Sequence, residues 1–340
     1  MNLSKKSQQG QFNTTNVDYI LKSFKSKIAG KDVIDPFCGE RDLLNWAEQH
    51  GASSVFGIDV DTSVQGADDY ANSFIDPYSY ENCFILANPP YLAKNKSSDK
   101  SIFELFNTDD LYKAALQTFA ECDEGIVIIP VNFLSSREAK TRAWFLKNFK
   151  ITQCILFEEQ VFDDTTSTVI AFHFEKGSNE PFTLTCMPSQ KTIEVFLNPK
   201  YNYLFGENFF SFIDTPNTYK VKRLLIGQEE PVSKLHLNAL DGGSKHNRVN
   251  LSISEAPYYG KQTDRSKASI VLGITLTEEQ EQEVCNLFNR TLEGFREEYH
   301  SLFLSNYRES STLYARKRIG FEQAYKLINK CISTVVKNTS

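Results

Sequence analysis

The chain has 340 residues, of which 41% are hydrophobic, and a formal net charge of −6, so it suits two folded domains and is not a generally basic nucleic-acid binder. No apolar run approaches the roughly 20 residues of a membrane span, and residues 1–10 lack the apolar stretch of a secretory signal, so we expect no membrane association. Seven scattered cysteines indicate free thiols in a reducing cytoplasm, and five histidines without ligand spacing lead us to expect no metal.

The first predicted element is an amphipathic helix, whose apolar residues recur at helical spacing over 17–28. Thr14 is among the residues that can cap it, and free donors at a helix start can also hold a carboxylate. A short strand over 31–35 follows, and the turn after it contains Gly39, which lets the backbone approach a ligand closely. Strand, turn and helix predict the first βα unit of a Rossmann-type sheet.

A second strand ends in Asp59, which lies 24 residues after Asp35. A carboxylate at about this spacing can accept both ribose hydroxyls of a nucleoside, although capping of the following segment is an alternative role. The third strand of this topology is expected to end near 72–76, where Asn72 and Asp76 occur in turn-like sequence.

The rest of the chain is organised around the strand 83–87 and the turn that follows it, Asn88-Pro89-Pro90-Tyr91. Two prolines fix φ and remove backbone donors, so they form a stiff turn at the carboxyl end of a strand, where open α/β sheets bind ligands. The Asn88 oxygen and the Pro89 carbonyl are acceptors, and the Tyr91 ring is a flat platform. This set suits a planar amino-bearing group such as adenine, and an ordinary surface turn is the alternative.

Further strands are predicted over 125–130, 152–157 and 168–174, with a helix over 136–149. Gly177 and Pro181 mark a boundary, so we predict a catalytic domain of residues 1–176 and a second, α+β domain of residues 177–340.

The second domain is predicted to hold short strands over 182–196, irregular sequence to about 260, and helices over 277–306 and 313–332. Residues 178–340 hold 20 Lys and Arg against 18 Asp and Glu, whereas residues 1–177 hold 17 against 25. Two loops rich in Gly and basic residues suit phosphate contacts and base-edge reading, although solvated turns are the alternative. Their candidate DNA-binding residues are Lys245, Arg248, Lys261 and Arg265.

These motifs, in this order, resemble those of the gamma-class DNA adenine-N6 methyltransferases of restriction-modification systems, which use S-adenosylmethionine. The resemblance covers roughly residues 9–176 and implies that Asn88, Pro89, Pro90 and Tyr91 form the catalytic turn. The segment from Asp35 resembles the family's Asp-Pro-Phe-x-Gly-x-Gly loop, with Arg41 where the second glycine is usual. The implied cofactor-binding positions are Thr14, Asp35, Phe37, Gly39, Asp59 and Asn72, with Asp76 as the alternative to Asn72.

The resemblance also implies a base-stacking aromatic residue before the last strand, which Phe162 matches unless it is a core residue. The C-terminal domain of that family recognises a short DNA sequence. We therefore expect a monomeric, cytoplasmic, site-specific DNA adenine-N6 methyltransferase acting on double-stranded DNA with S-adenosylmethionine. It would be the modification enzyme of a type II system with a separately encoded endonuclease. The alternatives are methylation of RNA adenine or protein glutamine, or a non-catalytic DNA-binding protein, which only the departure at Arg41 favours.

Overall fold

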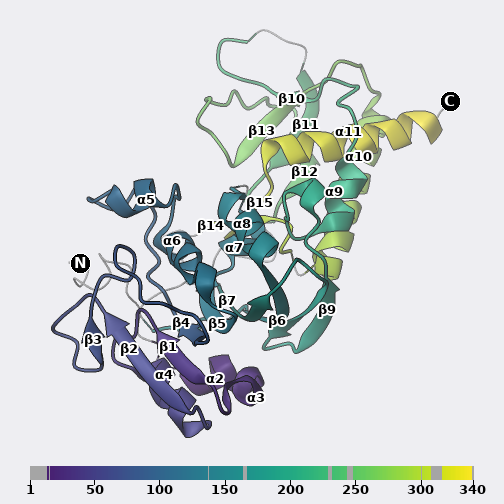
Figure 1. Cartoon of the computed structure of the whole chain (residues 1–340). Helices are drawn as coiled ribbons and strands as arrows, with labels where there is room; N and C mark the ends of the chain where they lie inside the picture. Colours follow the sequence, from purple (N-terminus) through teal and green to yellow (C-terminus); the bar gives the residue numbers. More distant parts are fainter. Residues whose placement is uncertain are drawn as a thin grey trace. The chain divides into compact units, whose positions relative to one another are not determined.

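The computed structural model describes residues 14, 16–136, 138–163, 167–228, 232–242, 248–299, 301–307 and 316–338. The chain divides into two compact units, one made of Met1–Phe133 and Glu138–Tyr203 and the other of Leu134–Arg137 and Leu204–Ser340 (Figure 1). Within the described ranges, no helix has both the length and the apolar character needed to cross a membrane. All seven cysteines carry free thiols.

The first unit is built on a nine-stranded sheet with the order β3-β2-β1-β4-β5-β7-β6-β8-β9. Its strands are β1 (Asp32–Asp35), β2 (Ser54–Asp59), β3 (Asp69–Tyr70), β4 (Phe84–Ala87), β5 (Glu124–Pro130), β6 (Phe149–Phe157), β7 (Val169–Lys176), β8 (Phe182–Met187) and β9 (Lys191–Val195). The strands from β3 to β5 in this order are parallel, and β7 is antiparallel to both of its neighbours. This mixed, mostly parallel sheet confirms the predicted Rossmann-like α/β fold class.

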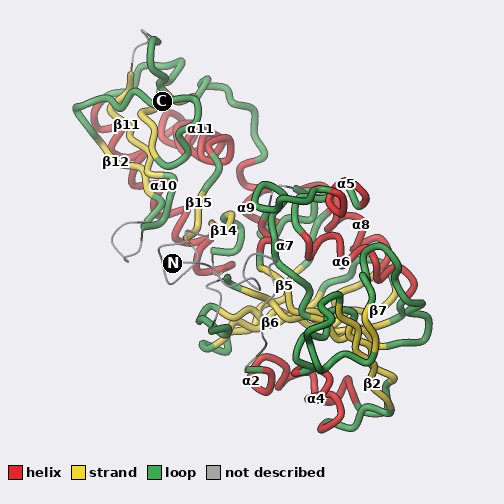
Figure 2. Tube along the Cα trace, turned by 90° about the vertical axis from the view of Figure 1, so that its left-hand side faces the viewer, coloured by secondary structure: helices red, strands yellow, loops and turns green. Residues whose placement is uncertain are grey.

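Helices cover both faces of this sheet. The α-helices of the first unit are α2 (Val17–Leu21), α3 (Lys25–Ile28), α4 (Asp42–Gln49), α5 (Ser101–Leu105), α6 (Leu111–Thr118) and α8 (Lys140–Asn148). The short helix α7 (Asn132–Ser135) follows β5, and its last two residues belong to the second unit. Figure 2 shows α2 and α4 on one side of the sheet and α6 and α8 on the other. All four residues of β4 are therefore buried, as are the five central residues of β5, which explains why these strands read as continuous apolar runs.

The first unit extends to Tyr203, so the boundary predicted at 176/177 falls inside its sheet. After β7, the chain turns at Gly177, whose φ is +153°, and β8 then pairs in parallel with β6 from Gln153↔Thr183 to Phe157↔Met187. β9 adds to the sheet as an antiparallel partner of β8. Glycine and proline mark the turn correctly, but a turn signal does not tell whether the next strand stays in the same sheet.

The second unit is α+β, as predicted. Its strands are β10 (Lys222–Arg223), β11 (Val232–Asn238), β12 (Asn250–Ile253), β13 (Lys267–Val271), β14 (Ser305–Tyr307) and β15 (Arg316–Arg318), and its main helices are α9 (Glu207–Ile213), α10 (Glu278–Tyr299) and α11 (Phe321–Asn338). Four of the strands form a sheet in the order β10-β13-β11-β12. The expectation of irregular sequence up to about 260 is therefore wrong, because most of these strands are too short to show a clear alternating pattern.

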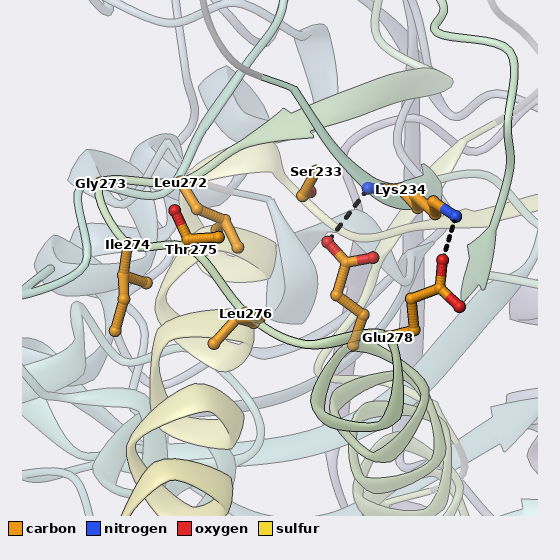
Figure 3. Close-up of a pocket in the computed structure, with 9 residues that line it drawn as sticks. Ser233, Lys234, Leu272, Gly273, Ile274, Thr275, Leu276 and Glu278 are labelled. Carbon is orange, nitrogen blue, oxygen red and sulfur yellow. Dashed lines mark hydrogen bonds and ion pairs between the residues drawn. The ribbon is translucent and has the colours of Figure 1, made fainter.

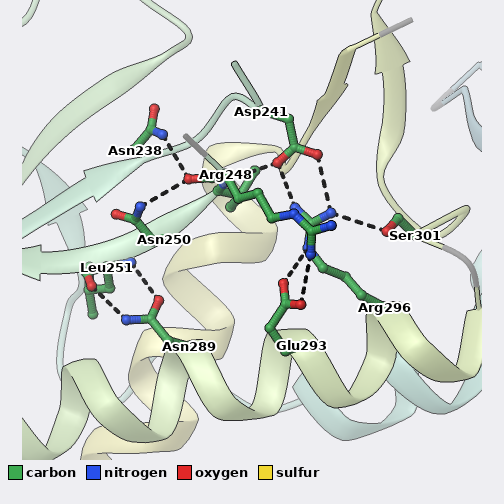
Figure 4. Close-up of polar contacts among 10 residues, drawn as sticks. Asn238, Asp241, Arg248, Asn250, Leu251, Asn289, Glu293, Arg296 and Ser301 are labelled. Atoms are coloured by element: carbon green, nitrogen blue, oxygen red, sulfur yellow. Dashed lines mark hydrogen bonds and ion pairs between the residues drawn. The ribbon is translucent and has the colours of Figure 1, made fainter. Parts of the chain in front are cut away.

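Helix α10 begins with the predicted capping box: Gln280 N donates to Thr277 Oγ1 at 3.2 Å, and Thr277 N donates to Gln280 Oε1 at 3.0 Å. The helix also covers the edge strand β12, where Asn289 receives a hydrogen bond from Leu251 N at 2.9 Å and donates one to Leu251 O at 2.8 Å (Figure 4). A side-chain amide therefore satisfies backbone groups that an edge strand would otherwise leave open.

Gly294 gives a direct test of this helix. A Cβ built on Gly294 meets no atom within 4 Å, and glycine inside a helix is less favourable than alanine by about 0.5–1 kcal/mol. We expect Gly294→Ala to raise the free energy of unfolding by about that amount in urea titrations. Gly206→Ala is the matched control and should destabilise, because φ at Gly206 is +106° and the added Cβ would lie 2.5 Å from Phe303 Cβ. A destabilised Gly294→Ala would contradict the packing described for α10.

Candidate functional site

A small pocket lies at the carboxyl ends of β1 and β4, which are adjacent parallel strands. Its lining residues are Thr14, Asp35, Phe37, Cys38, Gly39, Glu40, Asp42, Leu43 and Asn88. The pocket joins residues predicted for cofactor binding with the asparagine of the predicted catalytic turn. This juxtaposition follows from the sheet, because the carboxyl ends of neighbouring parallel strands share one edge.

The Asn88 amide is held by hydrogen bonds from both of its ends. Asn88 Nδ2 donates to Thr14 Oγ1 at 2.9 Å, and the Tyr91 hydroxyl lies within hydrogen-bond reach of both Asn88 Oδ1 and Ile128 O, the latter at 2.8 Å. Burial raises the pKa of Tyr91 well above its ordinary value, so its hydroxyl remains a neutral donor. These contacts fix which way the amide oxygen faces.

The ring of Tyr91 is buried, with 9% of the residue exposed, and it packs edge-on against Tyr112 with ring centroids 6.4 Å apart. Phe162 is also buried, with 1% exposed, which is the behaviour that the core alternative predicts. A stacking role requires these rings to become accessible to a base, and it stays a prediction for both residues. Pro89 is buried and Pro90 is half-buried.

Asp35 is a deeply buried carboxyl group of the pocket. Only 1% of the residue is exposed, and Phe37 N donates to Asp35 Oδ1 at 3.0 Å. Burial raises the pKa of Asp35 to about 8; the hydrogen bond from Phe37 opposes this shift and the nearby charge of Asp59 adds to it. The carboxyl group is therefore largely protonated at neutral pH, and a cation in the pocket would favour its ionised form.

The loop after β1 is tied to β2 through Asp59. Gly39 N donates to Asp59 Oδ2 at 2.9 Å, and Asp61 N donates to Asp59 Oδ1 at 2.8 Å. Asp59 is buried and does not line the pocket, so its observed contacts hold the loop and the segment after β2. A carboxylate offers about four acceptor sites, so ribose binding by Asp59 stays a prediction.

The two candidates for the adenine ring of the cofactor also lie outside the pocket lining. Asn72 Oδ1 accepts a hydrogen bond from Phe74 N at 3.1 Å, which makes a local turn, and Asp76 is exposed. The structure therefore places Thr14, Asp35, Phe37 and Gly39 beside Asn88 in one pocket, and it does not place Asn72 or Asp76 there.

Asp110, which the sequence did not single out, precedes α6 near the turn of residues 88–91. The backbone of Asp110 forms an antiparallel bridge with Ala93, and its Oδ1 is buried with no hydrogen-bond partner among the described residues. Burial raises the pKa of Asp110 to about 7, against the attraction of Lys113. The only sequence signal was an acidic pair at a helix start, which is ordinary for a cap.

The predicted DNA-binding residues belong to the second unit. Lys245 lies outside the described residues. Arg248 Nη1 forms an ion pair with Glu293 Oε2 at 2.9 Å, and the Arg248 carbonyl accepts hydrogen bonds from two asparagine side chains (Figure 4). Arg248, Lys261 and Arg265 are exposed, so each guanidinium or ammonium group can be reached from solvent.

Lys261 and Arg265 lie on a loop that is held in shape from inside the unit. Asp264 Oδ2 accepts hydrogen bonds from Lys261 N and from the Tyr258 hydroxyl, each at 2.7 Å. Arg223 donates to the carbonyls of Asp264 at 2.6 Å and Gln262 at 2.8 Å. The loop therefore presents its exposed side chains from a fixed backbone.

A second pocket, of about 560 Å³, lies between β11, the segment after β13 and the start of α10 (Figure 3). Its charged groups already have protein partners: Lys234 Nζ forms an ion pair with Glu278 Oε1 at 2.6 Å, and Glu281 Oε1 accepts a hydrogen bond from the backbone N–H of Lys234 at 3.1 Å. We assign no ligand to this pocket.

One group of possible metal ligands occurs in the described part of the chain, and it consists of Glu124, His173 and Glu175. His173 is fully buried; its Nε2 lies 2.9 Å from Glu124 Oε1 and its Nδ1 lies 2.6 Å from Thr152 Oγ1. Burial lowers the pKa of His173, so the ring is neutral at pH 7. Both ring nitrogens already have protein partners, and this is the pattern of a structural polar network.

No protein-family model matches the chain, and no curated protein matches it. Parts of several solved structures are similar to it. A modification subunit of a putative type I restriction enzyme from Vibrio vulnificus has 20% identity and a TM-score of 0.43, over 52% of this chain and 47% of that one. The type I methyltransferase subunit from Streptococcus thermophilus has 16% identity and a TM-score of 0.42, over 52% of this chain and 47% of that one. A putative class I S-adenosylmethionine-dependent methyltransferase from Listeria monocytogenes has 15% identity and a TM-score of 0.44, over 56% of this chain and 69% of that one. The chain thus covers about half the length of the two type I subunits.

Proposed function

We propose that this chain is a site-specific DNA adenine-N6 methyltransferase that uses S-adenosylmethionine, the modification enzyme of a type II restriction-modification system. The observation that carries the proposal is the shared pocket of Asn88 with Asp35, Phe37 and Gly39, at the carboxyl ends of β1 and β4. It supports transfer between a bound nucleoside-containing cofactor and an amino group held by the turn from Asn88 to Tyr91.

The chemistry required of the turn is the activation of a weak nucleophile. The lone pair of adenine N6 is delocalised into the ring, and two acceptors that bind its two hydrogens would localise that pair on nitrogen. Asn88 Oδ1 and the Pro89 carbonyl are those acceptors. An amide oxygen has two lone pairs, so Asn88 can receive a substrate N–H while the Tyr91 hydroxyl still donates to it. S-adenosylmethionine supplies a methyl group that is already activated by the positive sulfonium.

The pocket fits the cofactor at several points. A Cβ built on Gly39 meets no atom within 4 Å, so the space beside this backbone is open to a ligand. Asp35 would face the positive group of the cofactor. Thr14 would bind its methionine end, and Phe37 would contact it from the loop after β1. Asp59, with Asn72 or Asp76, would bind the nucleoside end from just outside the pocket lining.

The substrate in this proposal is an adenine flipped out of double-stranded DNA, because its N6 is inaccessible inside the stack. Tyr91 and Phe162 would stack on the flipped base, at about 1–3 kcal/mol per base. The second unit would recognise the target sequence through Lys245, Arg248, Lys261 and Arg265. The enzyme would act as a monomer in the cytoplasm, with a separately encoded endonuclease that it does not need to contact.

The exposed basic residues give a prediction for DNA binding. Replacing both Lys261 and Arg265 by alanine should weaken DNA binding and lower the magnitude of the slope of log K against log salt by about 2, because each lost phosphate contact removes about one unit. Fluorescence anisotropy over a salt series measures this slope. Lys234→Ala is the matched control, since its ammonium group already pairs with Glu278 and Glu255, and its slope should equal that of the unchanged protein. Equal slopes for all three proteins would remove these residues from the DNA surface.

The substrate class is tested by incubating the protein with tritiated S-adenosylmethionine and DNA, RNA or a whole-protein extract. The proposal predicts label in double-stranded DNA. Label confined to RNA or protein would support the alternative enzymes, and calorimetry without any cofactor binding would support the non-catalytic alternative.

A further inference from the structure

The cofactor loop departs from the family pattern at Arg41, and the structure gives this residue an unusual conformation. Arg41 has φ +70° and ψ +16°, in the left-handed region that favours glycine, immediately before α4. Its N–H donates to Cys38 O and its carbonyl accepts from Asn45 N, each at 2.9 Å. The backbone of Arg41 thus closes the loop and starts the helix in a left-handed conformation that glycine would adopt at a lower energetic cost.

The Arg41 side chain reaches away from the loop to a carboxylate on the segment before β3. Arg41 Nη1 lies 2.5 Å from Asp68 Oδ2 and donates to Gly66 O at 3.2 Å. Asp68 Oδ2 also accepts a hydrogen bond from Gly57 N of β2 at 2.7 Å, and Asp68 N donates to Gly57 O at 2.8 Å. Asp68 therefore connects the guanidinium to the central sheet.

The charge state of Asp68 agrees with this role. Burial alone would raise the pKa of Asp68, but the hydrogen bonds from Arg41 and Gly57 outweigh burial and hold that pKa below its usual range. The carboxylate is ionised at neutral pH and forms an ion pair with the Arg41 guanidinium, whose side chain is 21% exposed.

The segment that carries Asp68 also packs closely on the loop itself. A Cβ added to Gly66 would lie 2.9 Å from Arg41 Cβ and 3.0 Å from both Glu40 C and Gly39 O. The loop backbone is thus supported from the Gly66 side, while the Cβ direction of Gly39 remains open.

We propose that Arg41 and Asp68 form a brace that takes the place of the usual second glycine and holds the loop of residues 38–41 in the shape that binds S-adenosylmethionine. Neither residue lines the pocket, so both are positioning residues that act through the loop backbone. This inference rests on the proposed function, because it names how that same site is kept in its binding shape.

The test is the affinity for S-adenosylmethionine, measured by calorimetry on the full-length chain. Arg41→Ala keeps a residue that resists the left-handed conformation but removes the brace, so the binding-competent fraction falls and the affinity should drop by about tenfold. Asp68→Asn should weaken binding by about three- to tenfold. The double variant should lose no more affinity than the single variant with the larger loss, because both changes remove the same contact. Arg41→Gly should restore binding to within about twofold, because glycine adopts the left-handed conformation without support.

Glu48→Gln is the matched control. Glu48 Oε1 contacts the same guanidinium at 3.6 Å from an exposed position, and its loss should change the affinity by less than about twofold. Hydrogen exchange in the ligand-free protein should be faster at the backbone amide of residue 41 in Arg41→Ala and Asp68→Asn than in Glu48→Gln. Steady-state kinetics should show a raised KM for the cofactor with an unchanged kcat.

Two results would overturn the brace. One is an unchanged affinity in Arg41→Ala, and the other is an affinity in Arg41→Gly as low as in Arg41→Ala, which would mean that the arginine side chain acts on the cofactor directly. A lack of cofactor binding by the unchanged protein would instead refute the proposed function itself.

Discussion

Replacing Asn88 by alanine should lower kcat for methyl transfer by about 100- to 1000-fold, the effect expected when a positioned polar group at the reacting centre is removed. Asn88 Oδ1 is the acceptor that would localise the lone pair of the target nitrogen, and water cannot replace it in a fixed geometry. Cofactor affinity should fall by less than about tenfold, because the lost hydrogen bond that involves a predicted cofactor-binding residue, the bond to Thr14, is neutral and worth about 0.5–1.5 kcal/mol.

The control for this variant is Asn45→Ala, which removes the same side chain from an exposed position on α4. It should leave kcat, cofactor affinity and thermal stability unchanged. Single-turnover kinetics with saturating cofactor isolate the chemical step from binding. Retention of more than about a tenth of the rate by Asn88→Ala would refute the role assigned to this residue.

Binding of S-adenosylmethionine should tighten by about tenfold per pH unit between pH 5.5 and 7.0. Burial raises the pKa of Asp35 from 3.8 to about 8 in the free protein, so its carboxyl group is mostly protonated throughout this window. A cation bound beside Asp35 lowers that pKa, so cofactor binding releases a proton and is favoured by rising pH until the carboxyl group ionises by itself. The effect should level off above about pH 8.

Calorimetry in buffers of different ionisation enthalpy measures the released proton directly. Asp35→Asn should bind with an affinity that does not vary over this window, and S-adenosylhomocysteine, which lacks the sulfonium charge, should show a weaker pH dependence than S-adenosylmethionine. Burial raises the pKa of the neighbouring Cys38, so its thiol stays neutral and does not contribute. An affinity of the unchanged protein that is independent of pH would contradict the electrostatics assigned to Asp35.

The same shift has a consequence for stability. Because the folded-state pKa of Asp35 lies above its ordinary value, this group favours folding most at low pH, and that contribution is lost as pH rises toward about 8. The ligand-free protein should therefore lose stability from Asp35 as the pH rises through neutrality, and bound cofactor should oppose the loss.

Much of the first unit can be predicted from its sequence because its strands are apolar on both faces and end in polar or turn-forming residues. The predicted strands at 31–35 and 83–87 differ from β1 and β4 by one residue at their amino ends. The meeting of Asn88 with Asp35 and Gly39 then follows from the parallel sheet, because β1 and β4 are adjacent parallel strands whose carboxyl ends lie at the same edge.

Other features of the site depend on contacts that leave no local pattern. Asp68 and Arg41 are 27 residues apart in sequence, and neither belongs to a motif that links them. The burial of Tyr91 depends on Tyr112 and Ile128, which come from other elements. The sequence therefore indicated a flat ring at this position but could not predict its orientation. The membership of β8 in the first sheet has the same origin, because pairing with β6 is a tertiary choice.

According to the proposed function, the site around Asn88 transfers a methyl group to the N6 atom of adenine in DNA. The most direct measurement is to express the chain and its Asn88→Ala variant in a host without adenine methylation, hydrolyse the DNA to nucleosides and identify the methylated ones by mass spectrometry. We predict N6-methyldeoxyadenosine with the unchanged protein alone, at one recurring sequence in long-read data. N4-methyldeoxycytidine in its place, or unmodified DNA from cells that contain folded, cofactor-binding protein, would contradict the claim.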